Sequence, residues 1–365
     1  MKISFSTLAC PEYSWNDIIS TAADLSYDGI EIRGLGNDID VWKSGPFTDK
    51  KISKTLDTLE RTGLKISCFS SNICLKYRND DAIKEEISKY IDLAVKTDTP
   101  YIRILADNAP APDGHTPDDD YIAEVISAFA TPKVTLLVET NGVYSDTRKL
   151  KNLLDKIDSP YVAALWDMHH PYRYAGESPK TTVENLGKYI KYCHIKDSIL
   201  LDKDNHNSVV YKLCGEGDLP LEDCISELKK IGYDGYVTLE WVKRWTPTLE
   251  NADIVFPHFA EFMSSFITER KSFAHEKSVI SSEKKTKYDI NPQKSITNDG
   301  TYPFPKNQLI DCTFPDMLDI ICEQYPDQYA FRYCWDYEKE KVDYIRTYTE
   351  FREDVRTFAR SLIAM

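Results

Sequence analysis

The feature that most constrains the fold is a regular alternation of short apolar runs with longer amphipathic segments over the first ~260 residues. The apolar runs are five to seven residues long, and most are rich in β-branched or aromatic side chains. They cover residues 2–7, 29–33, 64–70, 101–106, 134–140, 162–168, 192–197 and 236–241. Runs this continuous are typical of parallel strands that are buried on both faces.

The segments between these runs carry apolar residues at helical spacing. They cover residues 15–25, 52–62, 82–95, 120–130, 148–157, 181–190 and 220–231. Eight strand–helix units in about 250 residues match the count and length of a closed (β/α)₈ TIM barrel, an α/β fold. An open, doubly wound sheet is the alternative. It usually has fewer strands and a glycine-rich first turn, whereas the first loop here, residues 8–12 (LACPE), contains no glycine.

The net charge and the cysteine content limit which binding partners and which cellular compartment are expected. Lys and Arg number 45 against 59 Asp and Glu, a net charge of -14, so nucleic acid is not expected as a general partner. No stretch approaches the roughly 20 apolar residues that span a bilayer, and the N-terminus lacks a signal-peptide core. Nine scattered cysteines without a Cys-x-x-Cys pair indicate free thiols. We therefore expect a cytoplasmic protein without a membrane partner.

The composition changes near residue 264. Residues 269–287 hold six Lys or Arg against three Glu, and residues 281–305 are polar and interrupted by prolines. We therefore predict a barrel over residues 1–265, a linker over 266–307 and a small, incomplete α+β segment over 308–365. Within the last segment we expect a strand over 328–333 and a helix over 349–364. A further helix is expected to carry Phe314, Met317, Leu318, Ile321 and Tyr325.

Four consecutive predicted strands carry a metal-ligating residue at or near their carboxyl ends, namely Glu139, Asp167, His194 and Glu240. In a (β/α)₈ barrel these ends converge on one mouth, where reactive groups lie. Three carboxylates so close together would repel one another unless a cation held them. Three oxygen ligands and one nitrogen ligand suit one divalent ion: Mn²⁺, Mg²⁺, Co²⁺ or Zn²⁺. The alternative is that each residue is an isolated polar group at a strand end.

Other polar residues follow the same strands. His170 comes three residues after Asp167 and could be a second ligand or a substrate contact. His169 could equally be a packed loop residue. Lys196 and Asp197 could hydrogen-bond substrate oxygens or orient the ligands, although ordinary ion pairing would also explain them.

Several of these segments together resemble one superfamily. Residues 136–142 (LLVETNG), 166–170 (WDMHH), 194–197 (HIKD) and 215–217 (GEG) are similar to the xylose-isomerase-like TIM barrel proteins, and 29–33 (GIEIR) resembles their second strand. The resemblance covers about residues 1–265. The superfamily includes sugar epimerases, hydroxypyruvate isomerase, inosose dehydratase and endonuclease IV.

The resemblance implies a metal held by Glu139, Asp167, His194 and Glu240. In the sugar epimerases two glutamates on the metal also move the proton, and Glu139 and Glu240 occupy those positions. The metal would acidify the C–H between a ketose carbonyl and its neighbouring hydroxyl. One carboxylate would take that proton and the other return it, through a metal-bound enediolate. His170 matches a substrate-contacting histidine, and Lys196 and Glu31 are further candidates for substrate binding.

Two departures from the family pattern bear on the reaction. Endonuclease IV needs additional histidines after strands 3 and 4, where this chain has residues 69–72 (FSSN) and 106–109 (ADNA). That absence, with the acidic charge, argues against cleavage at abasic sites. The ketose 3-epimerases also carry an arginine shortly after the strand-7 histidine, and residues 198–201 (SILL) contain none. Isomerase, epimerase and dehydratase therefore stay open.

Residues 314–318 (FPDML), 325–331 (YPDQYAF) and 348–351 (YTEF) resemble the start of an AMP-forming acyl-CoA synthetase. The phosphate loop of that class is absent, so we expect a ligase fragment from a longer fusion that does not adenylate by itself. The leading hypothesis for the chain is a divalent-metal-dependent sugar isomerase or epimerase acting on a sugar or polyol-derived ketose. The alternatives are an inosose-dehydratase-like lyase and a non-catalytic binding module fused to the ligase. A homo-oligomer is compatible with the sequence.

Overall fold

The computed structural model describes residues 1–78, 80–108, 111–202, 205–267, 318–319, 322–323, 326–327, 329–336 and 341–364. The chain divides into two compact units, Met1–His275 and Glu276–Met365, which are treated separately below. Most of the predicted linker over 266–307 lies outside the described residues. So do Phe314, Met317, Ile321 and Tyr325 of the predicted helix. The boundaries 1–265, 266–307 and 308–365 therefore remain predictions.

The first unit contains a closed barrel of eight parallel strands, which confirms the predicted (β/α)₈ fold. The strands close in the order β1-β10-β7-β6-β5-β4-β3-β2. Strand β1 completes the ring by pairing with β2 on one side and β10 on the other. The bounds are β1 Lys2–Ser6, β2 Gly29–Ile32, β3 Lys65–Cys74, β4 Tyr101–Leu105, β5 Thr135–Glu139, β6 Val162–Asp167, β7 Ile190–Ile195 and β10 Tyr236–Leu239.

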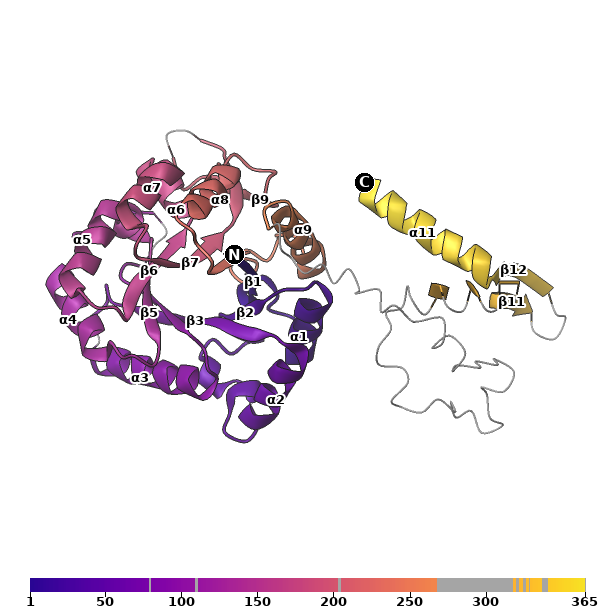
Figure 1. Ribbon diagram of the computed structural model, residues 1–365, viewed down its shortest axis with the longest axis horizontal. Coiled ribbons are helices and arrows are strands. Elements are labelled where there is room, and N and C mark those ends of the chain that lie inside the picture. The colour runs from indigo at the N-terminus through magenta and orange to yellow at the C-terminus, as the bar shows by residue number, and fades with distance from the viewer. Residues whose placement is uncertain are drawn as a thin grey trace. The chain divides into compact units, whose positions relative to one another are not determined.

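Helices surround this ring of strands (Figure 1). They are α1 Trp15–Asp24, α2 Ile52–Thr62, α3 Asp80–Lys96, α4 Asp119–Phe129, α5 Thr147–Ile157, α6 His169–Ala175, α7 Pro179–Leu186, α8 Leu221–Lys230 and α9 Ala252–Ser264. Short 3₁₀ turns cover Thr7–Ala9, Val41–Lys43, Gly45–Phe47 and Gly142–Ser145. Two predicted boundaries are each wrong by four residues: the strand expected over 64–70 continues to Cys74, and the helix expected over 181–190 ends at Leu186. Buried Ile190 instead starts β7 and pairs with Ala164 of β6.

Local sequence signals explain where several helices begin and end. Ser14 caps α1 by accepting a hydrogen bond from the Asp17 amide, while the Asp17 carboxylate accepts one from the Ser14 amide at 2.9 Å. This reciprocal pair is a capping box. Helix α2 ends at Gly63, whose φ of 69° is readily adopted only by a residue without a Cβ.

Side chains along a barrel strand point alternately into a large outer core and into a smaller inner core. In β5, Leu136 and Val138 pack in the large cluster that includes the helices, whereas Leu137 belongs to the small inner cluster. Successive strand residues point to opposite faces, so Glu139 continues the inward row that Leu137 begins. The strand period therefore carries the Glu139 side chain to the carboxyl-terminal mouth of the barrel.

An antiparallel hairpin that the sequence analysis did not predict follows β7. It consists of β8 Asp197–Leu200 and β9 Val209–Lys212. Buried Asp197 accepts hydrogen bonds from the backbone amides of Gly215, Gly217 and Leu219 at 2.9, 3.0 and 3.3 Å. A Cβ at Gly217 would collide with the same carboxylate. The sequence analysis considered Asp197 as a substrate contact, a group that orients the ligands or an ion-pair partner, whereas in the structure its oxygens hold this loop.

The second unit contains a two-stranded antiparallel sheet and one long helix. Strand β11 Tyr329–Asp336 pairs with β12 Lys341–Thr347, and α11 Tyr348–Ala364 follows directly. The strand predicted over 328–333 and the helix predicted over 349–364 are confirmed, while β12 was not predicted. This arrangement agrees with a small α+β segment.

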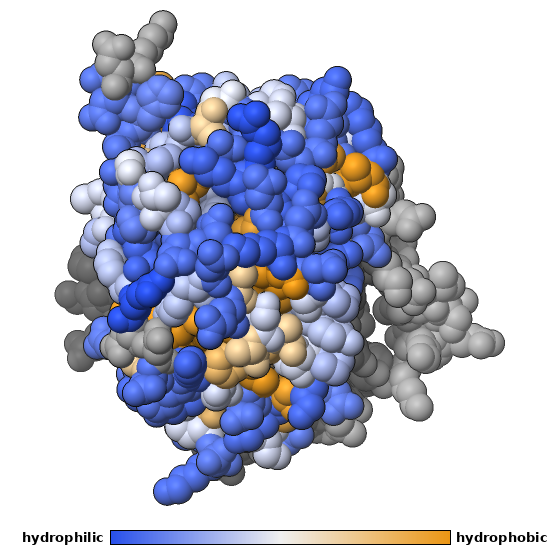
Figure 2. Space-filling view, turned by 90° about the vertical axis from the view of Figure 1, so that its left-hand side faces the viewer, coloured by the Kyte–Doolittle hydropathy of each residue, from blue (hydrophilic) through white to orange (hydrophobic). Residues whose placement is uncertain are grey.

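The surface shown in Figure 2 lies on the side of the barrel where α4 and α5 are seen in Figure 1. It is mainly hydrophilic with smaller apolar areas between. No helix in the described part of the chain is both long and apolar enough to cross a lipid bilayer. Among the cysteines whose side chains the structure describes, seven are free thiols, as predicted: Cys10, Cys68, Cys74, Cys193, Cys214, Cys224 and Cys322.

Candidate metal centre

The structure brings together the four residues that the sequence marked as metal ligands. Glu139 ends β5, Asp167 ends β6, His194 lies near the end of β7 and Glu240 directly follows β10. These strands are neighbours in the barrel, and Asp167 is paired in register with His194. One ligand atom from each of the four side chains lies within 4.8 Å of the others, and all four residues are buried.

His194 has the hydrogen bonding expected of a metal ligand. Its Nε2–H donates to Oε2 of Glu31 at 2.7 Å, which leaves Nδ1 as the nitrogen available to a metal ion. Nδ1 is buried without a hydrogen-bond partner among the described residues and lies 3.3 Å from Oε1 of Glu240. Burial alone would lower the pKa of His194, but the charges of Glu31 and Glu240 raise it to about 9. A carboxylate on one ring nitrogen and an open second nitrogen is the usual setting of a ligating histidine.

Glu31, which the sequence analysis named as a candidate for substrate binding, is the hydrogen-bond partner of His194. Its side chain is fully buried at the end of β2, and its hydrogen bond to His194 spans 163 sequence positions. Burial raises the pKa of this carboxyl, yet the charge and hydrogen bond of His194 bring it below the ordinary value. An ionised Glu31 can fix the orientation of the imidazole.

Two buried cations lie against the candidate ligands. The Lys196 ammonium contacts the carboxylates of both Asp167 and Glu240. Burial by itself would lower the pKa of Lys196, but these two carboxylates raise it well above its ordinary value. Nε of Arg103 lies 2.5 Å from Oε2 of Glu139, and Nη1 donates to the carbonyl oxygen of Ser71 at 3.0 Å.

The sequence analysis did not identify Arg103. The sequence feature that could have identified it is a single charged residue inside the apolar run over 101–106. Such a charge is rarely buried without a partner, so the run itself indicated an inward-facing ion pair.

His170 lies between two of the candidate ligands. Its Nδ1 is 2.9 Å from the carbonyl oxygen of Thr140 and 3.6 Å from Oε1 of Glu139, and its Nε2 is 3.6 Å from Oδ2 of Asp167. Burial and then the charge of Lys196 lower the pKa of His170 to about 3, so the ring is neutral at pH 7. His170 therefore borders the cluster and can exchange hydrogen bonds with a bound molecule. His169 instead packs beside the hairpin, with Nε2 3.0 Å from Oγ of Ser198.

These residues fit a divalent ion. Three carboxylates and one imidazole can provide an O₃N ligand set, and the unpartnered Nδ1 of His194 faces the carboxylates. Glu31 supplies the outer hydrogen bond that such sites generally contain.

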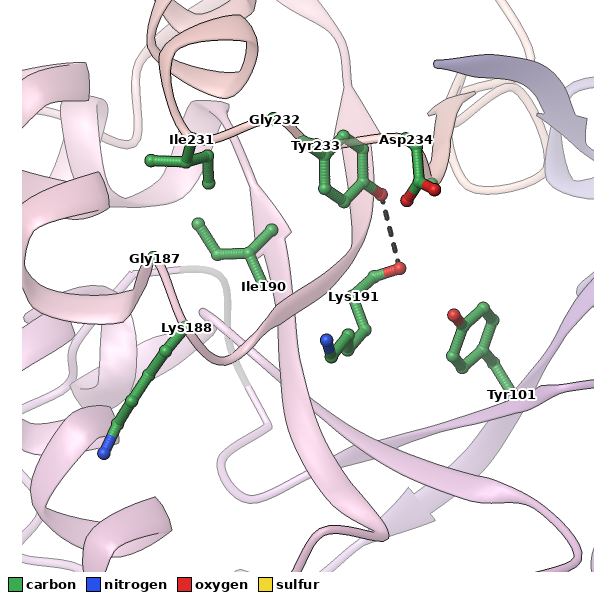
Figure 3. Close-up of a pocket in the computed structure, with 10 residues that line it drawn as sticks. Tyr101, Gly187, Lys188, Ile190, Lys191, Ile231, Gly232, Tyr233 and Asp234 are labelled. Atoms are coloured by element: carbon green, nitrogen blue, oxygen red, sulfur yellow. Dashed lines mark hydrogen bonds between the residues drawn. The ribbon is translucent and has the colours of Figure 1, made fainter.

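A second hollow in the barrel lies away from this cluster. It has a volume of about 270 Å³ and borders the amino ends of β4, β7 and β10 (Figure 3). There the Tyr233 hydroxyl donates to the carbonyl oxygen of Lys191 at 3.3 Å. Chemistry in barrels of this kind occurs at the carboxyl ends of the strands, so this hollow is not the candidate site.

The fold defines the class as TIM-barrel proteins, and the four converging residues at the strand ends form a cluster that could hold a divalent metal. A family model described as xylose isomerase-like TIM barrel matches residues 19–258. The chain belongs to this family. No curated protein sequence matches the chain.

Solved structures with the same fold include proteins named as different enzymes. The probable 3-DHS dehydratase AsbF from Bacillus anthracis is 20% identical, with coverage of 72% of this chain and 99% of that chain and a TM-score of 0.58. D-psicose 3-epimerase from Clostridium cellulolyticum H10 is 17% identical, with 74% and 100% coverage and a TM-score of 0.57. The IOLI protein, solved with a zinc atom bound, is 16% identical, with 73% and 100% coverage and a TM-score of 0.58. At these identities the likeness shows the fold alone.

Proposed function

We propose that this protein is a divalent-metal-dependent enzyme that isomerises or epimerises a small sugar or polyol-derived ketose. The observation that carries the proposal is the cluster of Glu139, Asp167, His194 and Glu240, with ligand atoms within 4.8 Å of one another and Nδ1 of His194 unpartnered. A divalent ion bound there supplies Lewis-acid chemistry that acidifies the C–H beside a carbonyl. Similarity to solved 3-epimerases is consistent with this reaction class.

The chain's own residues have separable roles in this proposal. Glu139 and Glu240 transfer the proton: one takes it from the substrate carbon, and the other returns it through an enediolate. Arg103 and Lys196 contact these two carboxylates and hold them in place. Neutral His170, bordering the ligands, hydrogen-bonds a substrate oxygen.

Metal content tests the proposal first. Plasma mass spectrometry on the purified chain should find about one divalent ion per chain, and His194→Ala should lose it. His115→Ala is the matched control, because His115 is exposed on a loop outside the cluster. If no ion binds after incubation with Mn²⁺, Co²⁺, Mg²⁺ and Zn²⁺, the enzyme proposal is wrong and a binding module takes its place.

Turnover tests the two-glutamate mechanism. Glu139→Gln should abolish conversion of any ketose substrate while the circular dichroism spectrum stays unchanged, because the amide cannot accept the proton. Glu124→Gln, on the exposed side of α4, should retain full activity. Full activity of Glu139→Gln would contradict the two-glutamate mechanism.

A dehydratase is the second candidate, and Lys196 favours it. Its buried ammonium lies on Asp167 and Glu240 at the candidate metal centre and carries protons that it can donate. Such a group can protonate a departing hydroxyl. The products distinguish the two reactions, because isomerisation conserves mass whereas dehydration loses water and creates an ultraviolet-absorbing enone.

For the second unit we propose the fragment suggested by the sequence, a segment over 308–365 similar to the start of an AMP-forming ligase. The hairpin β11–β12 and helix α11 are compatible with it. The chain should show no carboxylate-dependent exchange of pyrophosphate into ATP. Measurable exchange would contradict the fragment hypothesis.

A further inference from the structure

One buried cation at the carboxyl-terminal mouth has no carboxylate partner. Arg33 directly follows β2 and is only 9% exposed. Nη2 donates to Oδ1 of Asn72 at 2.6 Å, but Nη1 is buried without a hydrogen-bond partner, and no carboxylate of the described residues lies within 4.0 Å. A buried, unpaired guanidinium destabilises a fold. In a chain with a net charge of -14, this suggests that the partner comes from outside.

Arg33 adjoins the candidate metal centre along the chain. It directly follows β2, two residues beyond Glu31, whose carboxylate accepts the hydrogen bond from His194. Burial, followed by the charge of Arg103, lowers the pKa of Arg33 to about 10, with Glu240 and Glu31 among the opposing charges. Arg33 is therefore charged at pH 7 and interacts electrostatically with the residues around the metal site.

The groups around Arg33 do not neutralise its charge, which can therefore attract a bound anion. The exposed ring of Trp245, which follows β10, lies with its centroid 5.6 Å from the guanidinium carbon. Asp40, which lines the same hollow as Asn72, is paired with Lys43 at 2.5 Å. Glu86 of α3 is influenced by the charge of Arg33 without approaching within ion-pair distance.

Arg33 is not needed to neutralise the carboxylates of the candidate metal centre. Two cations are already used, since Arg103 pairs with Glu139 and Lys196 pairs with both Asp167 and Glu240. The candidate centre and its hydrogen-bonded neighbour contain the four carboxylates Glu31, Glu139, Asp167 and Glu240. Arg103, Lys196 and a divalent ion would balance these four charges, so this cluster does not require Arg33.

We propose that Arg33 and Asn72 form an anion site, and that the substrate is an acidic sugar whose carboxylate or phosphate binds there while its reacting carbons lie at the metal centre. This inference rests on the proposed function and deepens it. A guanidinium can bind either anion through paired N–H donors, and Nη1 provides donors that no protein group uses. Asn72 accepts a hydrogen bond from Nη2 and so fixes the plane of the guanidinium group.

Calorimetric titration of the full, Mn²⁺-loaded chain tests this site with three probes: D-fructose, D-fructuronate and D-fructose 6-phosphate. We expect one of the two acids to bind at least tenfold more tightly than D-fructose, and which acid does so identifies the anion. Arg33→Gln should reduce that preference to less than twofold without changing the manganese content. Arg148→Gln is the matched control, because it removes the same charge from an exposed position on α5 and should preserve the preference.

Thermal melting separates anion binding from a structural role. Removing an unpaired buried charge should leave the melting temperature of Arg33→Gln unchanged or raise it, and Arg33→Met should behave alike. Equal affinity for all three probes in the manganese-loaded wild type would overturn the anion site and leave the proposed function standing. Failure to bind manganese would instead overturn the proposed function. The titrations on the metal-free chain would then still report whether Arg33 confers a preference for anions.

Discussion

Binding of the divalent ion should be strongly pH-dependent, because the ion and a proton compete for His194. The pKa of about 9 reflects the charges of Glu31 and Glu240, which outweigh the opposing effect of burial. At pH 7 only about one metal-free chain in 100 then carries a neutral His194, a penalty of roughly 3 kcal/mol on metal binding.

A rise in pH has opposite effects on the stability of the metal-free fold and on metal binding. Protonated His194 stabilises the metal-free fold, so this contribution is complete below the unfolded pKa of about 6.5 and is lost as the pH rises through about 9. Over the same interval the apparent metal affinity should rise about tenfold per pH unit and then level off.

Isothermal titration with Mn²⁺ at several pH values, in two buffers that differ in ionisation enthalpy, measures this linkage. We expect release of about one proton per bound ion at pH 7. Glu31→Gln removes the charge that lies 2.7 Å from Nε2, so the pKa of His194 should fall and the affinity should level off at lower pH. Glu124→Gln, remote from the site, should retain the wild-type pH dependence. Affinity that is independent of pH, with no proton release, would refute this reasoning.

Two further substitutions test individual contacts. Asp197→Ala leaves the amides of the 215–219 loop without their acceptor, so chemical denaturation should show a loss of about 3–5 kcal/mol while the metal content stays unchanged. Loss of the metal with unchanged stability would instead place Asp197 in the metal site. Lys196→Met removes the ammonium from Asp167 and Glu240, so titration should show tighter metal binding. Weaker binding would mean that Lys196 supports the ion rather than competes with it.

Most of the barrel follows from local sequence. Strands covered on both faces must be apolar along their whole length, so all eight barrel strands appear as continuous runs. The hairpin β8–β9 and strand β12 have no such signature, because a hairpin outside the barrel does not require continuous burial. β9, for example, has no buried residue. The end of α7 was also misplaced, because pairing between β6 and β7, and not helical propensity, decides where Ile190 lies.

The four candidate ligands were predictable because each lies at or near the end of a strand and the fold class places those ends together. Their surrounding partners were not. The sequence analysis did not identify Arg103, and Glu31 was expected to contact substrate, although it hydrogen-bonds His194. A single charge inside an apolar run signals that Arg103 is buried, but no neighbouring residue identifies its partner Glu139, and none identifies the pairing of Glu31 with His194.

The sequence by itself therefore determined the strand–helix alternation, the barrel and the identity of the residues at its mouth, because these depend on hydrophobic periodicity over a few residues. Only the tertiary structure decided which cation neutralises which carboxylate, which nitrogen of His194 stays open and why Arg33 is left without a partner. Ion pairing falls steeply with distance in a buried site. It is therefore decided by how strands far apart in the chain are brought together when the barrel closes.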